Sequence, residues 1–317
     1  MKKILLLHTG GTISMAENEE GTVGQQDDHP LADFASHIGA EADIEERVVF
    51  NLPSPHIEPD HVLKLAEIIN NSDADGYVIT HGTDTMEETA YLLDLLTDNQ
   101  KTIIMTGAMK SSNELGSDAA SNLAGALMTA VSDEANGYGV LVAMNGELHA
   151  SREVYKASSI NLAAFKSISG PVGILTKTGP SFTHKLSPLS TIDAKTLDAD
   201  VYLIKAYEGM NGELIDAIRS LKPDGLVIEA FGQGNLPKTC MPALKNVLQD
   251  RLPIVIVSRS NESIVQPTYS YEGGGSELKS LGAIQVSGLS GQKARLKMLA
   301  VLSKTKDLEE IKKMMQA

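Results

Sequence analysis

The sequence predicts an α/β protein of two domains, each a mostly parallel sheet flanked by helices, with the larger domain first. Three observations support this. Short apolar runs of strand length alternate with amphipathic stretches of helix length. The alternation is lost over residues 146–176, and residues 177–200 carry Gly179, Pro180 and Pro188 among polar residues before it resumes at residue 201. A chain of 317 residues is also long enough to bury two cores.

The predicted elements follow from these patterns. In the first domain we expect strands at 4–7, 48–50, 76–80, 102–106 and 140–144, and helices at 31–38, 59–69, 86–96 and 117–135, with a long loop over 14–30. In the second we expect strands at 201–206, 226–230 and 254–258, and helices at 213–221, 241–248, 293–302 and 308–315, with an irregular stretch at 262–275. The expected domains are 1–178, flavodoxin-like, and 201–317, Rossmann-like, joined by a linker at 179–200.

Composition excludes several classes of function. The net charge of −14 disfavours nucleic acid and anionic membranes as partners, because both repel an acidic surface. A lone cysteine, Cys240, forms no disulfide framework, and no His, Cys or acidic cluster has metal-ligand spacing. The apolar run after Lys2-Lys3 stops at four residues, too short for a signal peptide or a membrane span. We therefore expect a cytoplasmic protein without metal or cofactor.

Two strand-end turns each present a threonine. The first strand runs into Thr9-Gly10-Gly11-Thr12-Ile13, and the third runs into His81-Gly82-Thr83-Asp84-Thr85. The glycines permit sharp turns, and the carboxyl edge of a parallel sheet is where open α/β folds bind ligands. A purely structural alternative is also open, since Thr83 or Asp84 would cap the following helix, and Asp84 with Glu87 has capping-box spacing.

These turns resemble the two signature motifs of bacterial-type L-asparaginases. The resemblance extends in order along nearly the whole chain, through 106–110, 144–156, 232–235 and 292–295. It implies an amidohydrolase that converts L-asparagine and water into L-aspartate and ammonia through a threonine acyl-enzyme. The short amino-terminal apolar run and the single cysteine suit the cytoplasmic branch of the family.

The resemblance implies four catalytic residues. Thr12 is the expected nucleophile, and a threonine hydroxyl needs a group to take its proton. Thr83 is expected to be hydrogen-bonded to Lys156 and Asp84, and Asp84 also to hold the α-ammonium group of the substrate. In the family the two threonines have been assigned to the two half-reactions in different ways. His8 and His81 flank the threonines but are expected to be structural, because the family uses neither as its base.

Further residues are expected to bind substrate. Gly11 and Gly82 belong to the two turns, and Ser54 matches a family serine that hydrogen-bonds the α-carboxylate. Many family members have a glutamine after it. Here Pro55 stands in that place and has no N–H to donate, so a backbone N–H or His56 must supply the contact.

A second departure concerns the mobile loop that follows Thr12. Secreted family members carry a tyrosine there, whereas this chain has no tyrosine before Tyr77 and offers Thr22 as a neighbour of the nucleophile. Either another group orients Thr12 or the loop closes differently.

Two residues are expected to reach the site from a neighbouring subunit. Asn235, in Gly232-Gln233-Gly234-Asn235, matches such a family residue, and Glu277 lies near a second cross-subunit position. A homodimer or homotetramer is therefore the expected working unit.

Other functions remain alternatives. A dual asparaginase-glutaminase differs by one methylene in its substrate, which a pocket discriminates by only about 1 to 3 kcal/mol. The asparaginase-like subunit of a tRNA-dependent amidotransferase would need an extra amino-terminal domain, for which a strand starting at residue 4 leaves no room. A nucleotide-binding Rossmann protein needs Gly-x-Gly-x-x-Gly after the first strand, which residues 8–13 lack. A catalytically weak amino-acid-binding relative is also considered.

Overall fold

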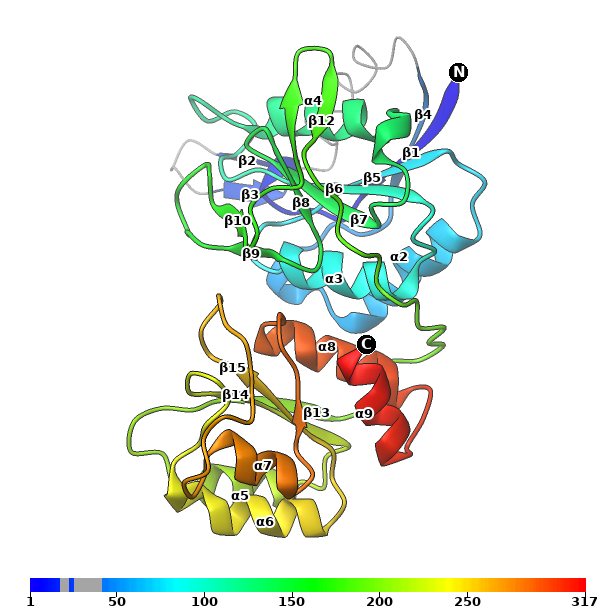
Figure 1. The fold of residues 1–317 in the computed structure, drawn as a ribbon. Coiled ribbons are helices and arrows are strands. Elements are labelled where there is room, and N and C mark those ends of the chain that lie inside the picture. The colour runs from blue at the N-terminus through cyan, green and yellow to red at the C-terminus, as the bar shows by residue number, and fades with distance from the viewer. Residues whose placement is uncertain (18–22, 26–41) are drawn as a thin grey trace. The chain divides into compact units, whose positions relative to one another are not determined.

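The computed structural model describes residues 1–17, 23–25 and 42–317, and divides into two compact α/β units, Met1–Thr191 and Ile192–Ala317 (Figure 1). Each unit has its own parallel sheet and its own buried core. The two-domain α/β fold expected from the alternating pattern is confirmed.

Unit 1 is organised around an eight-stranded sheet in the order β12-β11-β8-β7-β6-β5-β1-β4. Five neighbours, β4, β1, β5, β6 and β7, are parallel, and the other three strands extend the sheet in antiparallel fashion. The strands are β1 Lys2–His8, β4 Ala42–Val48, β5 Gly76–Thr80, β6 Thr102–Thr106, β7 Val140–Met144, β8 Glu147–Ala150, β11 Gly173–Thr176 and β12 Gly179–Phe182. β12 lies inside the segment expected as a linker.

Helices cover both faces of this sheet. α4 (Ala119–Ala130) lies on one face, and α2 (Pro59–Asn70) and α3 (Met86–Leu96) lie on the other (Figure 1). β5, β6 and β7 are buried at every position, so their side chains contact helices on both sides. Continuous apolar runs such as Val140–Met144 are the sequence signature of strands buried on both faces.

Three local expectations were wrong. The edge strand was expected at 48–50 but is β4, whose charged and mostly exposed residues carry no apolar run to reveal it. Part of the expected 14–30 loop is a short antiparallel pair, β2 (Met15–Glu17) with β3 (Val23–Gln25). α4 ends at Ala130, and a 3-10 turn, η3 (Asp133–Ala135), follows it. The helix expected at 31–38 lies outside the described residues.

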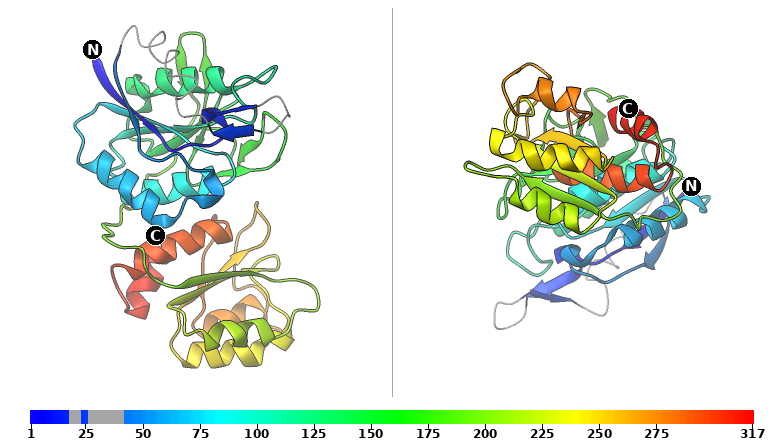
Figure 2. Two further views of the ribbon diagram at one scale, coloured as in Figure 1. Left: turned by 180° about the vertical axis from the view of Figure 1, so that it is seen from behind. Right: turned by 90° about the horizontal axis from the view of Figure 1, so that it is seen from below.

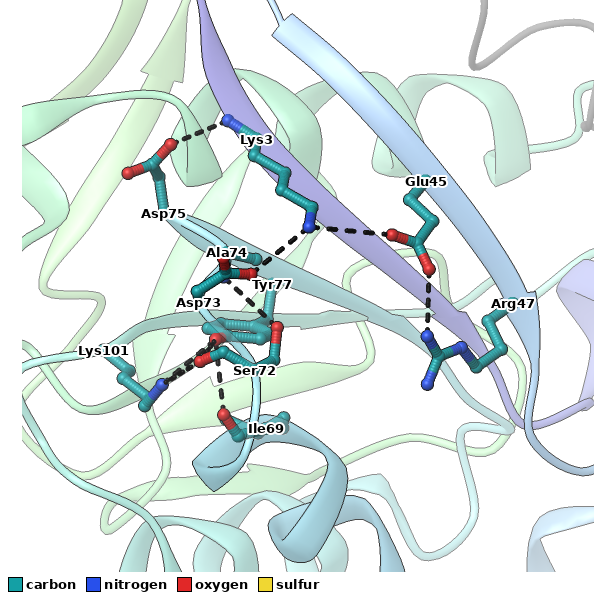
Figure 3. Close-up of polar contacts among 10 residues, drawn as sticks. All are labelled: Lys3, Glu45, Arg47, Ile69, Ser72, Asp73, Ala74, Asp75, Tyr77 and Lys101. Atoms are coloured by element: carbon teal, nitrogen blue, oxygen red, sulfur yellow. Dashed lines mark hydrogen bonds and ion pairs between the residues drawn. The ribbon is translucent and has the colours of Figure 1, made fainter.

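Polar contacts link the loops and strands at the end of the unit 1 sheet where β1 begins (Figure 3). The backbone N–H of Lys3 donates to Asp75 Oδ2 at 2.7 Å, while Lys3 Nζ reaches Asp73 at 3.2 Å and Glu45 at 3.9 Å. Exposed ion pairs of this kind contribute little stability and mainly fix local geometry. They lie at the end of β1 opposite to His8, away from the strand ends where the two threonine turns begin.

Unit 2 has a four-stranded parallel sheet in the order β13-β14-β15-β16. α5, α6 and α7 lie on one face, and α8 and α9 on the other (Figures 1 and 2). The elements are β13 Val201–Lys205, α5 Glu213–Ser220, β14 Gly225–Ala230, α6 Met241–Gln249, β15 Ile254–Ser258, α7 Gly275–Ser280, β16 Ile284–Gln285, α8 Gly291–Leu302 and α9 Leu308–Gln316. α7 and β16 were not predicted, because they are only six and two residues long, too short for a periodic pattern. Among the described residues, no helix is both long enough and apolar enough to cross a bilayer.

Candidate active site

The two threonine turns leave the sheet side by side. β1 pairs in parallel with β5, with His8 opposite Thr80, so the turns that follow begin at the same edge. The direction in which successive strands are added to the sheet reverses between β1 and β5, because β4 lies on one side of β1 and β5 on the other. Such a reversal opens a crevice at the carboxyl ends of the strands, where open α/β sheets bind ligands.

Glycines allow the turns to touch. Gly11, at φ +86°, lies so close to the other turn that an added Cβ would stand 2.3 Å from the Cα of Gly82. An added Cβ on Gly10, at φ +104°, would stand 2.4 Å from the carbonyl oxygen of Leu52. These contacts require glycine on steric and conformational grounds. They place Thr12, the first residue of a 3-10 turn, η1 (Thr12–Ser14), one residue from the contact with Gly82.

Lys156 joins this edge from β9 (Val154–Lys156). Its Nζ donates to Thr83 Oγ1 at 2.9 Å and to Asp84 Oδ1 at 2.6 Å. The Lys156 side chain is 14% exposed, whereas that of Asp84 is 63% exposed. The structure therefore brings together the expected threonine, aspartate and lysine, with the lysine largely buried and the carboxylate facing solvent.

Ser54 connects a third loop to the same turn. It begins a 3-10 turn, η2 (Ser54–His56), and its Oγ accepts the backbone N–H of Asp84 at 3.2 Å. An added Cβ on Gly82 would stand 2.7 Å from Ser54 Oγ, so Ser54 lies directly against the turn. Pro55 follows it and is exposed.

The capping alternative for the second turn was wrong. α3 begins at Met86 with Thr85 as its N-cap residue, and the Thr85 hydroxyl donates to the Ser54 carbonyl at 2.9 Å. Glu87, which the capping box would have used, accepts the backbone N–H of Lys156 at 3.1 Å. This role of Glu87 was missed, because only the fold brings residue 156 beside residue 87.

Both histidines that flank the threonine turns are buried. His81 is fully buried and its Nδ1–H donates to the Gly82 carbonyl at 2.7 Å; burial lowers the pKa of His81 to about 4. His8 Nδ1 lies 2.9 Å from Thr80 Oγ1. His81 is thus neutral near pH 7 and orients the peptide of Gly82, which fits a structural role.

The two expected cross-subunit residues lie in unit 2, and each accepts a backbone N–H near the start of α7. Asn235 Oδ1 accepts the N–H of Gly275 at 3.0 Å, and Glu277 Oε2 accepts the N–H of Gly273 at 2.8 Å. That N–H and the nearby Lys245 ammonium hold the pKa of Glu277 below its usual value. Both side chains therefore organise the loop that precedes α7.

Fold and site together define a class of protein. A reversal point in a parallel sheet, two threonine turns in contact and a largely buried lysine that bridges threonine to aspartate bring hydroxyl, amine and carboxylate groups together at one sheet edge, an arrangement typical of hydrolytic enzymes. Across residues 1–17, 23–25 and 42–317, no group of three or more His, Cys, Asp or Glu side chains is placed to hold a metal ion.

Comparisons with known proteins identify the family. Residues 3–187 match the family model "Asparaginase, N-terminal", and residues 200–315 match "Glutaminase/Asparaginase C-terminal domain". The chain therefore belongs to the asparaginase family.

Individual relatives match over nearly their full length. A probable L-asparaginase of Deinococcus radiodurans is 34% identical over 99% of this chain and 97% of its own. An L-asparaginase of Bacillus licheniformis is 32% identical over 96% of this chain and 97% of its own. The solved structure of a probable cytoplasmic L-asparaginase from Campylobacter jejuni superposes with a TM-score of 0.87 at 30% identity, covering 99% of each chain.

Proposed function

We propose that this enzyme hydrolyses L-asparagine to L-aspartate and ammonia in the cytoplasm through an acyl-enzyme on Thr12. Membership of the asparaginase family supports the reaction, as do two relatives matched over nearly their full length, one a probable L-asparaginase and one an L-asparaginase. The observation that carries the mechanism is the bridge from Lys156 Nζ to Thr83 Oγ1 and Asp84 Oδ1.

Two displacements make up the proposed reaction. Thr12 Oγ attacks the side-chain amide carbon, its proton passes through the Thr83–Lys156 pair to the amide nitrogen, and the C–N bond breaks as that nitrogen leaves as ammonia. Water then attacks the ester, frees aspartate and restores the Thr12 hydroxyl. Lys156, shielded from solvent beside Thr83, serves as the base. Its contact with Asp84 holds the base at a fixed distance from the carboxylate that binds the substrate.

Substrate binding uses the surrounding turns. The exposed carboxylate of Asp84 binds the α-ammonium group, since an ionised acceptor and a cationic donor make a strong hydrogen bond. Ser54 binds the α-carboxylate, and the backbones of Gly11 and Gly82 line the crevice. Pro55 supplies no donor, so a backbone N–H or His56 replaces that contact.

Self-association completes the proposal. Asn235 reaches the site of a neighbouring subunit in a homodimer or homotetramer. Glu277, near the start of α7, lies close to a second cross-subunit position. Residues 1–178 form the catalytic domain, joined through 179–200 to 201–317. The acidic chain takes neither nucleic acid nor membrane as a partner.

Trapping the intermediate tests the nucleophile. The enzyme is mixed with an asparagine analogue that acylates faster than it is hydrolysed, and intact mass with peptide mapping locates the added aspartyl group. An adduct on Thr12 that is lost in Thr12→Ala is expected. An adduct on Thr83 instead would overturn the assignment.

L-Glutamine is the second candidate substrate. The carboxyl-terminal match to a glutaminase/asparaginase domain favours testing it. One methylene changes binding by only about 1 to 3 kcal/mol. Ammonia release from each amide at equal concentration measures the preference directly.

A further inference from the structure

Helix α3 carries two buried carboxylates on one side. Glu87 is 8% exposed and Asp94 is 5% exposed, among fully or nearly fully buried apolar neighbours. Seven residues are close to two helical turns, so both side chains leave the same side of the helix. A carboxylate is costly to bury unless hydrogen bonds satisfy it, so the partners of these two groups show what they do.

Both carboxylates bind the short segment that delivers Lys156, residues 151–156. Glu87 Oε2 accepts the N–H of Lys156 at 3.1 Å. Asp94 Oδ2 accepts the hydroxyl of Ser151, and its Oδ1 accepts the N–H of Val140 at 3.0 Å. One carboxylate thus holds each end of the segment.

Lys156 itself lies outside the main sheet, which the segment leaves at Ser151, where the Ser151 N–H donates to the Val140 carbonyl at 3.0 Å. β9, which ends at Lys156, pairs with β10 (Phe165–Ser167) in a separate two-stranded sheet of three residue pairs. Thr83 and Asp84, by contrast, lie just before Thr85, the N-cap residue of α3. The helix is therefore a common frame: it starts beside Thr83 and Asp84, and its own carboxylates hold the strand that carries their partner.

We infer that Glu87 and Asp94 are positioning residues that hold segment 151–156 on α3 and so set the place of Lys156 Nζ at Thr83 and Asp84. The inference rests on the proposed function of Lys156. A displacement of about 1 Å in a catalytic group is enough to cost roughly 100-fold in rate. Glu87 accepts the N–H of Lys156 and Asp94 accepts the hydroxyl of Ser151, so each acts through the segment that carries the lysine.

A rescue series tests the first anchor. Glu87→Ala removes the acceptor of the Lys156 N–H, and we expect kcat to fall about 10- to 100-fold while KM for L-asparagine stays within about threefold. Glu87→Gln retains an acceptor oxygen and is expected to return kcat to within about threefold of wild type. Failure of the glutamine variant to restore kcat would overturn the positioning role.

The second anchor has its own variant and a matched control. Ser151→Ala removes the Asp94 contact to the segment and leaves the Val140 contact in place, and a smaller fall in kcat, about 3- to 10-fold, is expected. In Thr129→Val, a fully buried hydroxyl that donates to the Gly125 carbonyl at 2.8 Å on α4 is lost. Its kcat should equal that of wild type even where its melting temperature falls as far as that of Ser151→Ala. An equal fall in kcat in the control would overturn the inference.

A double-mutant cycle separates this inference from the mechanism. If Glu87 acts through the lysine, adding Glu87→Ala to Lys156→Met should change the residual kcat less than twofold. If Glu87→Ala lowers kcat by the same factor in wild type and in Lys156→Met, Glu87 does not act by positioning the lysine. Near wild-type activity of Lys156→Met by itself would instead refute the proposed base. Should Glu87→Ala fail to fold, Ser151→Ala enters the same cycle in its place.

Discussion

The amine of Lys156 lies 2.6 Å from a carboxylate oxygen of Asp84, although 72 positions separate them in the chain. The same amine lies 2.9 Å from Thr83 Oγ1. A lysine that is 14% exposed and shared between a hydroxyl and a carboxylate is suited to move a proton rather than to solubilise a surface.

Removing this amine should nearly abolish turnover. For Lys156→Met we expect kcat to fall about 100- to 10,000-fold, the usual contribution of general acid–base catalysis. Steady-state ammonia release measures it. Lys166→Met, which changes an exposed lysine on the neighbouring strand β10, is the matched control and should keep wild-type kcat. A Lys156→Met rate close to wild type would remove the lysine from the mechanism.

The contact between the two turns should tolerate no side chain at Gly11. In Gly11→Ala the new Cβ meets the backbone of Gly82, so the turns must separate, and we expect kcat/KM to fall at least about 100-fold. Gly170→Ala is the matched control, because Gly170 has φ +85° and nothing within 4 Å of an added Cβ. It should lose only about 1 kcal/mol of stability and keep its activity. Equal activity losses in the two variants would show that backbone strain, not the contact, matters.

Acid should destabilise the protein through His81. Burial lowers the pKa of His81 to about 4, below its unfolded value of 6.5, so the unfolded chain binds more protons between these values. Stability from this group is complete above pH 6.5 and falls as pH drops towards 4. From pH 7 to pH 5 we expect a loss of roughly 2 kcal/mol from this residue.

Urea unfolding at several pH values checks this against His81→Asn. The asparagine amide can still donate to the Gly82 carbonyl but does not titrate. The stability difference between wild type and variant should shrink by roughly 2 kcal/mol from pH 7 to pH 5. A difference that is independent of pH would mean that His81 does not carry the effect.

Complementation tests the cross-subunit role of Asn235. Asn235→Asp keeps an acceptor for the Gly275 N–H while changing the group presented to a partner, and we expect a loss of activity of at least about tenfold. The Asn235→Asp subunit is co-expressed with an inactive Thr12→Ala subunit, and the mixed oligomer is isolated through a different tag on each. A site that takes Thr12 from the first subunit and Asn235 from the second then has both residues intact. Activity should then return towards half of wild type. Mixed oligomers no more active than Asn235→Asp alone would place Asn235 outside the partner's site.

The pattern of apolar residues along the sequence predicted the central strands of the unit 1 sheet but not its edge strands. β5, β6, β7 and α3 match their predicted bounds, because full burial gives strands an unbroken apolar run and gives α3 apolar residues on several sides. β4 was misplaced because an exposed edge strand has no apolar signal. β12 was hidden in a Gly- and Pro-containing segment for the same reason.

Some residues of the candidate site could likewise be predicted from the sequence, and others could not. Thr12, Thr83 and Asp84 are evident from the sequence, because each follows a strand and a glycine within a few residues. Glu87 has the spacing of a helix cap and instead holds the backbone of Lys156. A hydrogen bond across 69 positions leaves no trace in local pattern, so its partner could not be identified from residue 87.

The sequence by itself determined two parallel-sheet units, the two glycine turns with their threonines, and the family resemblance, since these depend on strand periodicity and on glycine at neighbouring positions. Only the tertiary structure decided that Gly11 lies against Gly82, how closely Lys156 approaches Thr83 and Asp84, and that α3 holds the strand that carries this lysine. The physical reason is that those contacts arise from strand order and helix packing, which bring distant segments together and are set by the whole core rather than by any short stretch of residues.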